Sequence, residues 1–159
     1  MSKQLSPSAQ RVQDVLSQHG VMCEVVELPQ STRTAKEAAD AIGCGVAQIA
    51  KSLVFKAKHT KRPILVIASG ANRVNENKVA QLIGEPIEKA DADFVRKRTG
   101  FAIGGVAPVG HLEEIETLID ENLLGYEEIW AAAGTPHAVF RLTPEQLKKI
   151  TGGRITSVT

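Results

Sequence analysis

An unbroken apolar run from Pro63 to Ala68 constrains the fold of this chain more than any other segment. Continuous apolar residues over this length are typical of a buried strand, whereas a half-exposed strand alternates apolar and polar residues. Segments with helical spacing precede and follow the run. We therefore predict an α/β fold in which this run is a buried strand, and a length of 159 residues suits a single domain over 1–159.

Capping residues predict where the helices begin and end. A capping side chain, a capping box or a proline at the first helical position marks each predicted start, and a glycine marks each stop. The predicted starts are Ser6, Thr34, Asn75, Asp91 and Thr143, and the predicted stops are Gly20, Gly43, Gly84, Gly100 and Gly152. A further short helical turn is predicted over 46–50.

Strand-like composition fills the remaining segments. Strands are predicted over 23–28, 52–56, 63–68, 117–120, 128–133, 138–142 and 154–158, the last as an edge strand because its residues alternate. Consecutive strands near the C-terminus cannot all be joined by crossover helices. The sequence therefore predicts a mixed β-sheet flanked by helices.

Composition points to the cytoplasm. The first residues are polar and no apolar run is long enough to span a bilayer, so we expect neither a signal peptide nor a membrane anchor. Cys23 and Cys44 form no C-x-x-C motif, and we expect two buried thiols in a reducing compartment.

A formal net charge of +1 does not predict nucleic-acid binding, so an RNA partner would need a local basic patch. Two clusters could contact phosphates, although charged runs are more often solvated faces. The candidate contacts are Lys56, Lys58, Lys61 and Arg62 around one turn, and Arg96 and Arg98 near a helix end.

A glycine-rich loop, Gly104-Gly105-Val106-Ala107-Pro108, is the first candidate for chemistry. It matches neither a P-loop nor a G-x-G-x-x-G fingerprint. Its N–H groups could approach a ligand and stabilise an oxyanion, or the loop could be a tight turn only.

The segment Gly134-Thr135-Pro136-His137 is the second candidate, because it could line a pocket with an imidazole that binds or transfers a proton. A hairpin turn with an exposed histidine is the alternative. Lys51 has no local spacing that distinguishes it from a surface lysine. The histidines lack metal-ligand spacing and no G-x-S-x-G motif is present, so we expect no metal and no cofactor.

Three blocks, taken in order, resemble the YbaK/EbsC family, whose domain is also inserted in bacterial prolyl-tRNA synthetases. They are T-A-K-E-A-A (34–39) with Q-I-A-K-S-L-V-F (48–55), G-G-V-A-P-V-G-H (104–111) and A-G-T-P-H (133–137). The resemblance implies a hydrolase that removes a wrong amino acid from tRNA. It implies that Lys51 is the essential lysine, that Gly104 and Gly105 belong to the catalytic loop, and that the 134–137 block is a pocket wall.

The resemblance also implies the partners: the acceptor end of an aminoacyl-tRNA, with prolyl-tRNA synthetase or an elongation factor as transient partners. Alanine, serine, threonine or a small non-protein amino acid on tRNA for proline are the expected acyl groups. Cysteine is less favoured, because the cysteine-specific branch carries a tyrosine where this chain has Glu27-Leu28-Pro29. A non-catalytic tRNA- or synthetase-binding module and a small-molecule esterase are the alternatives. The oligomeric state is left open.

Overall fold

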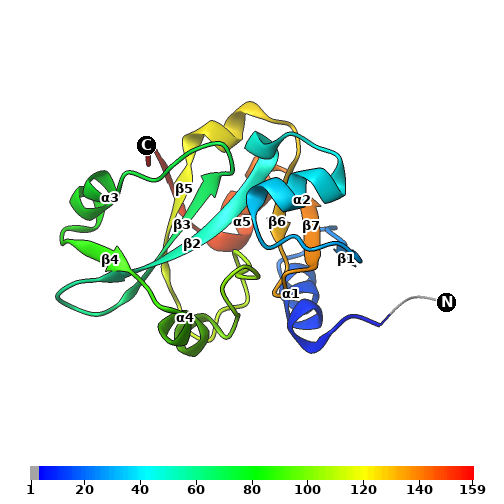
Figure 1. Ribbon diagram of the computed structural model, residues 1–159, viewed down its shortest axis with the longest axis horizontal. Coiled ribbons are helices and arrows are strands. Elements are labelled where there is room, and N and C mark those ends of the chain that lie inside the picture. Colours follow the sequence, from blue (N-terminus) through cyan, green and yellow to red (C-terminus); the bar gives the residue numbers. More distant parts are fainter. Residues whose placement is uncertain (1–3) are drawn as a thin grey trace.

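Eight strands form one mixed sheet in the computed structural model, which describes residues 4–159 (Figure 1). The strand order is β1-β7-β6-β2-β3-β5-β8, and β4 pairs with β2 outside this path. The strands are β1 (Val25–Glu27), β2 (Ile49–Ala57), β3 (Pro63–Ser69), β4 (Ile87–Lys89), β5 (Glu116–Asp120), β6 (Ile129–Ala132), β7 (Ala138–Leu142) and β8 (Arg154–Thr156). The predicted α/β fold with a mixed sheet is confirmed.

Five α-helices and two short 3-10 helices connect the strands. They are α1 (Pro7–Gln18), α2 (Ala35–Ile42), η1 (Val46–Gln48), α3 (Glu76–Ile83), α4 (Ala92–Thr99), η2 (Glu121–Gly125) and α5 (Pro144–Thr151). The side chains of Thr34, Asn75, Asp91 and Thr143 each accept a hydrogen bond from a first-turn N–H, as their sequence patterns predict. Ser6 precedes α1 but its side chain makes no capping bond, so that part of the prediction is wrong.

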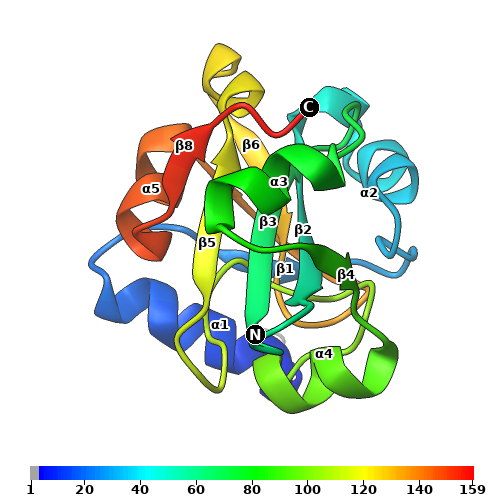
Figure 2. The ribbon, with the colours of Figure 1, turned by 90° about the vertical axis from the view of Figure 1, so that its left-hand side faces the viewer.

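The apolar run of β3 is buried over its whole length, as predicted, because the sheet is covered on both faces. Leu65 and Ile67 pack into the cluster that contains the buried residues of α1 and α5. Ile64 and Val66 point the other way and pack against α3. Figure 2 shows α3 crossing in front of β2 and β3, with α1 and α5 to one side.

The middle of strand β2 is hydrogen-bonded to a neighbouring strand on one side only. Along the side opposite β3, Ile49 and Ala50 pair with β6, and Phe55 to Ala57 pair with β4. Between these two contacts, residues 51–54 pair with β3 alone. The sheet therefore has an internal gap beside β2.

The structure also shows what the sequence patterns missed. The predicted helical turn over 46–50 ends at Gln48, and β2 begins at Ile49, so Lys51 lies inside a strand and not at its start. The three-residue strand β4 and the helix η2 were not predicted. Cys23 is buried as expected, whereas Cys44 is half-buried. None of the helices in the described part of the chain is long and apolar enough to cross a membrane.

Candidate active site

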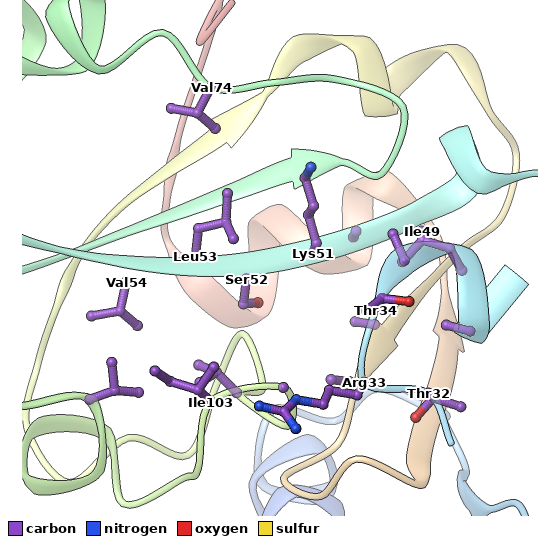
Figure 3. A pocket seen from close by; sticks show the side chains of 18 of the residues that line it. Thr32, Arg33, Thr34, Ile49, Lys51, Ser52, Leu53, Val54, Val74 and Ile103 are labelled. Carbon is purple, nitrogen blue, oxygen red and sulfur yellow. The ribbon is translucent and has the colours of Figure 1, made fainter. Parts of the chain in front are cut away.

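A cavity of about 610 Å³ lies at the gap beside β2 (Figure 3). Its size suits a small ligand with part of a larger one attached. Because the gap opens through the sheet, both faces of β2 contribute: Lys51 and Leu53 point to one side, and Ser52 and Val54 to the other. The loop residue Ile103 lies on the Ser52 side.

Lys51 reaches the cavity with its ammonium group held at one edge. Lys51 Nζ donates a hydrogen bond to the backbone oxygen of Asn72 at 2.7 Å. Partial burial lowers the pKa of Lys51, and the negative charge of Asp120 opposes part of that shift. The ammonium therefore keeps two donors for a ligand, and it loses its proton at a lower pH than an exposed lysine would.

Asp120 is a functional candidate that the sequence analysis missed. Its side chain is buried and accepts hydrogen bonds from Ser69 N at 3.0 Å, Asn72 Nδ2 at 2.8 Å and Asn122 N at 2.9 Å. These bonds fix the Asn72 segment whose carbonyl holds Lys51. The available sequence signal was an aspartate at the end of an apolar strand, which is a pattern that also occurs in ordinary helix caps.

Only some residues of the glycine-rich loop 104–108 line the cavity. Gly104 and Val106 line it, whereas Gly105, Ala107 and Pro108 are buried outside it. Gly105 N already donates to Ala102 O at 3.0 Å, so its N–H is not available for an oxyanion. Gly104 has φ +92° and the stem of Arg33 packs directly over it.

His111 fixes the far end of the glycine loop. Its Nε2 lies 2.7 Å from the backbone oxygen of Ala107, which requires the proton to be on that nitrogen. Burial lowers the pKa of His111, the bond to Ala107 opposes the shift, and Arg11 adds to it. A neutral His111 therefore holds the loop at neutral pH.

The segment Gly134-Thr135-Pro136-His137 lies outside the cavity lining and holds a neighbouring loop instead. Pro136 O accepts from Thr32 N at 2.6 Å, and His137 O accepts from Leu28 N at 2.8 Å. The ring of His137 is 2.8 Å from Gln30 O. The segment thus positions the loop 28–33, which places Thr32 and Arg33 in the cavity wall.

Most of the predicted phosphate contacts have partners elsewhere on the protein. Arg62 pairs with Glu85 and Glu116, Lys61 with Glu88, and Arg98 with Glu113. Lys56 lies over the ring of Phe94 at 5.3 Å. Lys58 and Arg96 form no ion pair within residues 4–159, and none of these six lines the cavity.

The cavity carries its own excess of positive charge. Its lining contains four basic residues and one acidic residue: Arg33, Lys51, Arg73, Lys89 and Glu76. Within the described chain, Arg33, Arg73 and Lys89 have no carboxylate partner, and all three are exposed. The rim therefore favours an anionic ligand.

The fold and the cavity define an α/β domain with a preformed ligand site built around a lysine and a glycine loop. No cluster of three or more His, Cys, Asp or Glu side chains among residues 4–159 could hold a metal ion.

The family model of the aminoacyl-tRNA editing domain matches residues 29–150, and the chain belongs to that family. The predicted family is confirmed, and with it the class of editing deacylases.

Solved structures and curated proteins agree with this assignment. A solved structure described as a candidate trans-editing enzyme for prolyl-tRNA synthetase is 51% identical, with a TM-score of 0.92, over 98% of this chain and 99% of the other. The proline–tRNA ligase of Limosilactobacillus fermentum is 36% identical over 58% of this chain and 17% of the ligase. EbsC of Enterococcus faecalis, described as a candidate Cys-tRNA(Pro)/Cys-tRNA(Cys) deacylase, is 24% identical over 100% of this chain and 98% of EbsC.

Replacing Gly105 by alanine is expected to destabilise the protein by about 1–3 kcal/mol, because the new methyl group would lie 2.8 Å from the Thr135 backbone. Gly125→Ala is the matched control, since nothing lies within 4 Å of its added methyl group. Urea unfolding of both variants measures the difference. Equal stability of the two would contradict the close approach of the glycine loop to the 134–137 segment.

Proposed function

We propose that this protein hydrolyses the ester bond of a mischarged aminoacyl-tRNA in the cavity beside β2. The observation that carries the proposal is that Lys51 and Gly104, which lie 53 positions apart by number, line one cavity through the gap in the sheet. Family membership supports the same activity. The cavity holds the acyl group and the terminal adenosine, and the products are a free amino acid and a deacylated tRNA.

The ester carbonyl is polarised by donors on the cavity wall. The Lys51 ammonium, which keeps two donors beside its bond to Asn72, stabilises the negative charge on the carbonyl oxygen as water adds to the carbon. Gly104 lies on the other side of β2 and forms part of the wall around the acyl group. The tetrahedral intermediate collapses, the bond to the 3′-oxygen breaks, and that oxygen takes up a proton. Gly105 contributes packing and not a hydrogen bond to the substrate.

The attacking water must lose a proton, and we assign its transfer to the 2′-hydroxyl of the terminal adenosine, which accepts that proton while it passes its own proton to the departing 3′-oxygen. Glu76 is the one carboxylate in the described cavity lining, and it is the protein alternative. Asp120 is excluded as the base because it is buried and already accepts three hydrogen bonds.

The tRNA for proline is the proposed partner, and a small wrong amino acid is the proposed acyl group. A synthetase pocket discriminates poorly against a smaller side chain, by about 1–3 kcal/mol, so a separate hydrolytic site is required. The likeness to EbsC makes cysteine the second candidate acyl group. Prolyl-tRNA synthetase and an elongation factor are the proposed transient partners, in the cytoplasm.

Lys51→Ala is expected to lower the rate of deacylation by about 10²–10³-fold, the usual loss when an oxyanion donor is removed. Release of amino acid from mischarged tRNA for proline measures this rate, with a variant at an exposed lysine, Lys149→Ala, as control.

The rate should also depend on pH, because the active form of Lys51 is the ammonium. Since burial lowers the pKa of Lys51, the rate of deacylation should decrease as the pH rises through that lowered pKa. Asp120→Asn should move that fall to lower pH still, since the carboxylate raises the pKa. An unchanged rate for Lys51→Ala removes the lysine from the mechanism.

A substrate that ends in 2′-deoxyadenosine is expected to react at least about 10²-fold more slowly, the usual contribution of a general base. Glu76→Gln should keep most of the wild-type rate on the normal substrate. The reverse pattern, with the deoxy substrate hydrolysed at full rate and Glu76→Gln inactive, would assign the base to Glu76.

Arg73→Ala is expected to weaken tRNA binding and to reduce the slope of log affinity against log salt by about 0.7, the value for one phosphate contact on a single strand. Arg98→Ala is the comparison, because its side chain is paired with Glu113 and lies outside the cavity lining. Filter binding over a salt series measures both. A larger slope change for Arg98→Ala would place the tRNA on the predicted basic clusters instead.

A further inference from the structure

The cavity beside β2 is open on both faces of the sheet. Residues 51–54 are all half-buried, whereas every residue of β3 is buried. Successive side chains of a strand point to opposite faces. Figure 3 accordingly shows Lys51 directed toward Val74 on one face of β2, and Val54 on the other face with Ile103, which is 44% exposed. Solvent therefore reaches the gap through a lysine-side opening and through a second opening beside Ile103.

Each opening carries an exposed arginine. Arg73 directly follows Asn72, whose backbone oxygen holds Lys51, so it belongs to the lysine-side opening. Arg33 lies on the opposite face, and its guanidinium is directed toward Ile103 (Figure 3). Both arginines line the cavity, and neither has a carboxylate partner within residues 4–159. Both openings therefore attract anions, and the sheet separates them.

The side chain of Arg33 is held in place by a close contact that requires glycine at position 104. A Cβ atom on Gly104 would lie 2.5 Å from Cγ of Arg33, and 3.2 Å from its Cδ and Nε. The absence of a side chain at this position lets the stem of Arg33 lie against the glycine loop. The guanidinium has no hydrogen-bond acceptor among residues 4–159, since the one bond of Arg33 is from its backbone N to Ser31 Oγ. Its donors are thus available to a ligand.

Hydrolysis of an aminoacyl ester creates an anion that the ester does not have. Water adds to the carbonyl carbon, the bond to the 3′-oxygen breaks, and the free amino acid releases the proton of its carboxyl group to solvent, because the pKa of that group is well below neutral pH. The new carboxylate forms beside Lys51, where the deacylated tRNA still occupies the lysine-side opening. The second opening offers the amino acid a path that the tRNA does not block.

We propose that Arg33 binds the carboxylate of the released amino acid, and that the amino acid leaves through the sheet on the face opposite the tRNA. This inference rests on the proposed deacylase function and adds a product site to it. Arginine suits this role because its planar fork of donors matches a carboxylate. A phosphate of the tRNA is the competing ligand for Arg33.

Binding of free amino acids tests the site without hydrolysis. Alanine, serine and 2-aminobutyrate, and the amide of each, are titrated into the whole protein, and NMR shifts give the affinities. At least one free amino acid is expected to bind about tenfold or more tightly than its amide, because only the carboxylate forms a charge-assisted bond. Arg33→Gln should bring this ratio toward one, whereas Arg73→Gln, the matched variant at the other opening, should keep it.

Equal affinities for acid and amide, no binding of any free amino acid, or a ratio that survives in Arg33→Gln would each overturn the proposal. Binding through Arg33 in a protein that hydrolyses no ester would support the carboxylate site, and the deacylase function alone would then fail.

Simultaneous binding of the two products tests the exit path. The titration is repeated with uncharged tRNA for proline at saturating concentration. The affinity for the amino acid should change by less than about twofold, because ligands at separate openings have little coupling free energy. Loss of amino-acid binding when the tRNA is bound would place both products at one opening and contradict the exit through the sheet.

Inhibition by the free amino acid separates product binding from substrate binding. In Arg33→Gln the inhibition constant is expected to increase by about tenfold or more, whereas kcat/KM for the ester should decrease by a smaller factor, because the ester has no carboxylate. Thermal unfolding checks that the variant is folded. Equal factors for the two constants would assign Arg33 to the ester or to a phosphate of the tRNA, and would refute its role as a product site.

Discussion

The interrupted pairing of β2 is the constraint on which the rest of the site depends. A strand in the middle of a sheet normally has hydrogen-bonded neighbours on both sides, which leaves no room for a ligand. Here β6 and β4 share one side of β2 and leave residues 51–54 open between them. The gap lets Lys51 from one face and Gly104 from the other line the same cavity.

The second requirement is that the loops around this gap, 28–33 and the segment of Asn72, are fixed by hydrogen bonds. The 134–137 segment does this through backbone bonds to the loop 28–33 and through its close approach to Gly105. Asp120 does the same on the opposite face, where it fixes Asn72. The parts of the chain with the most suggestive sequence motifs therefore partly serve as supports, and the cavity lining includes residues without a motif, such as Arg33 and Arg73.

Local sequence patterns predicted the elements whose determinants are local. Helix caps such as Thr34 and Asn75, and the apolar run of β3, depend on neighbours in sequence and were found. Strand β4 has three residues and depends on its pairing with β2, so composition could not reveal it. Lys51 was found through family resemblance alone. Asp120 was missed because an aspartate at the end of a strand becomes informative only when its burial and its three hydrogen bonds are known.

The 134–137 segment holds the loop 28–33 through Thr32 N, Leu28 N and Gln30 O, which are all backbone atoms of the loop. Substitutions at 28–33 other than to proline therefore change the side chains in the cavity wall and keep the bonds that fix the loop's backbone. The shape of this wall is thus specified by backbone bonds, separately from the side chains that it presents to the cavity.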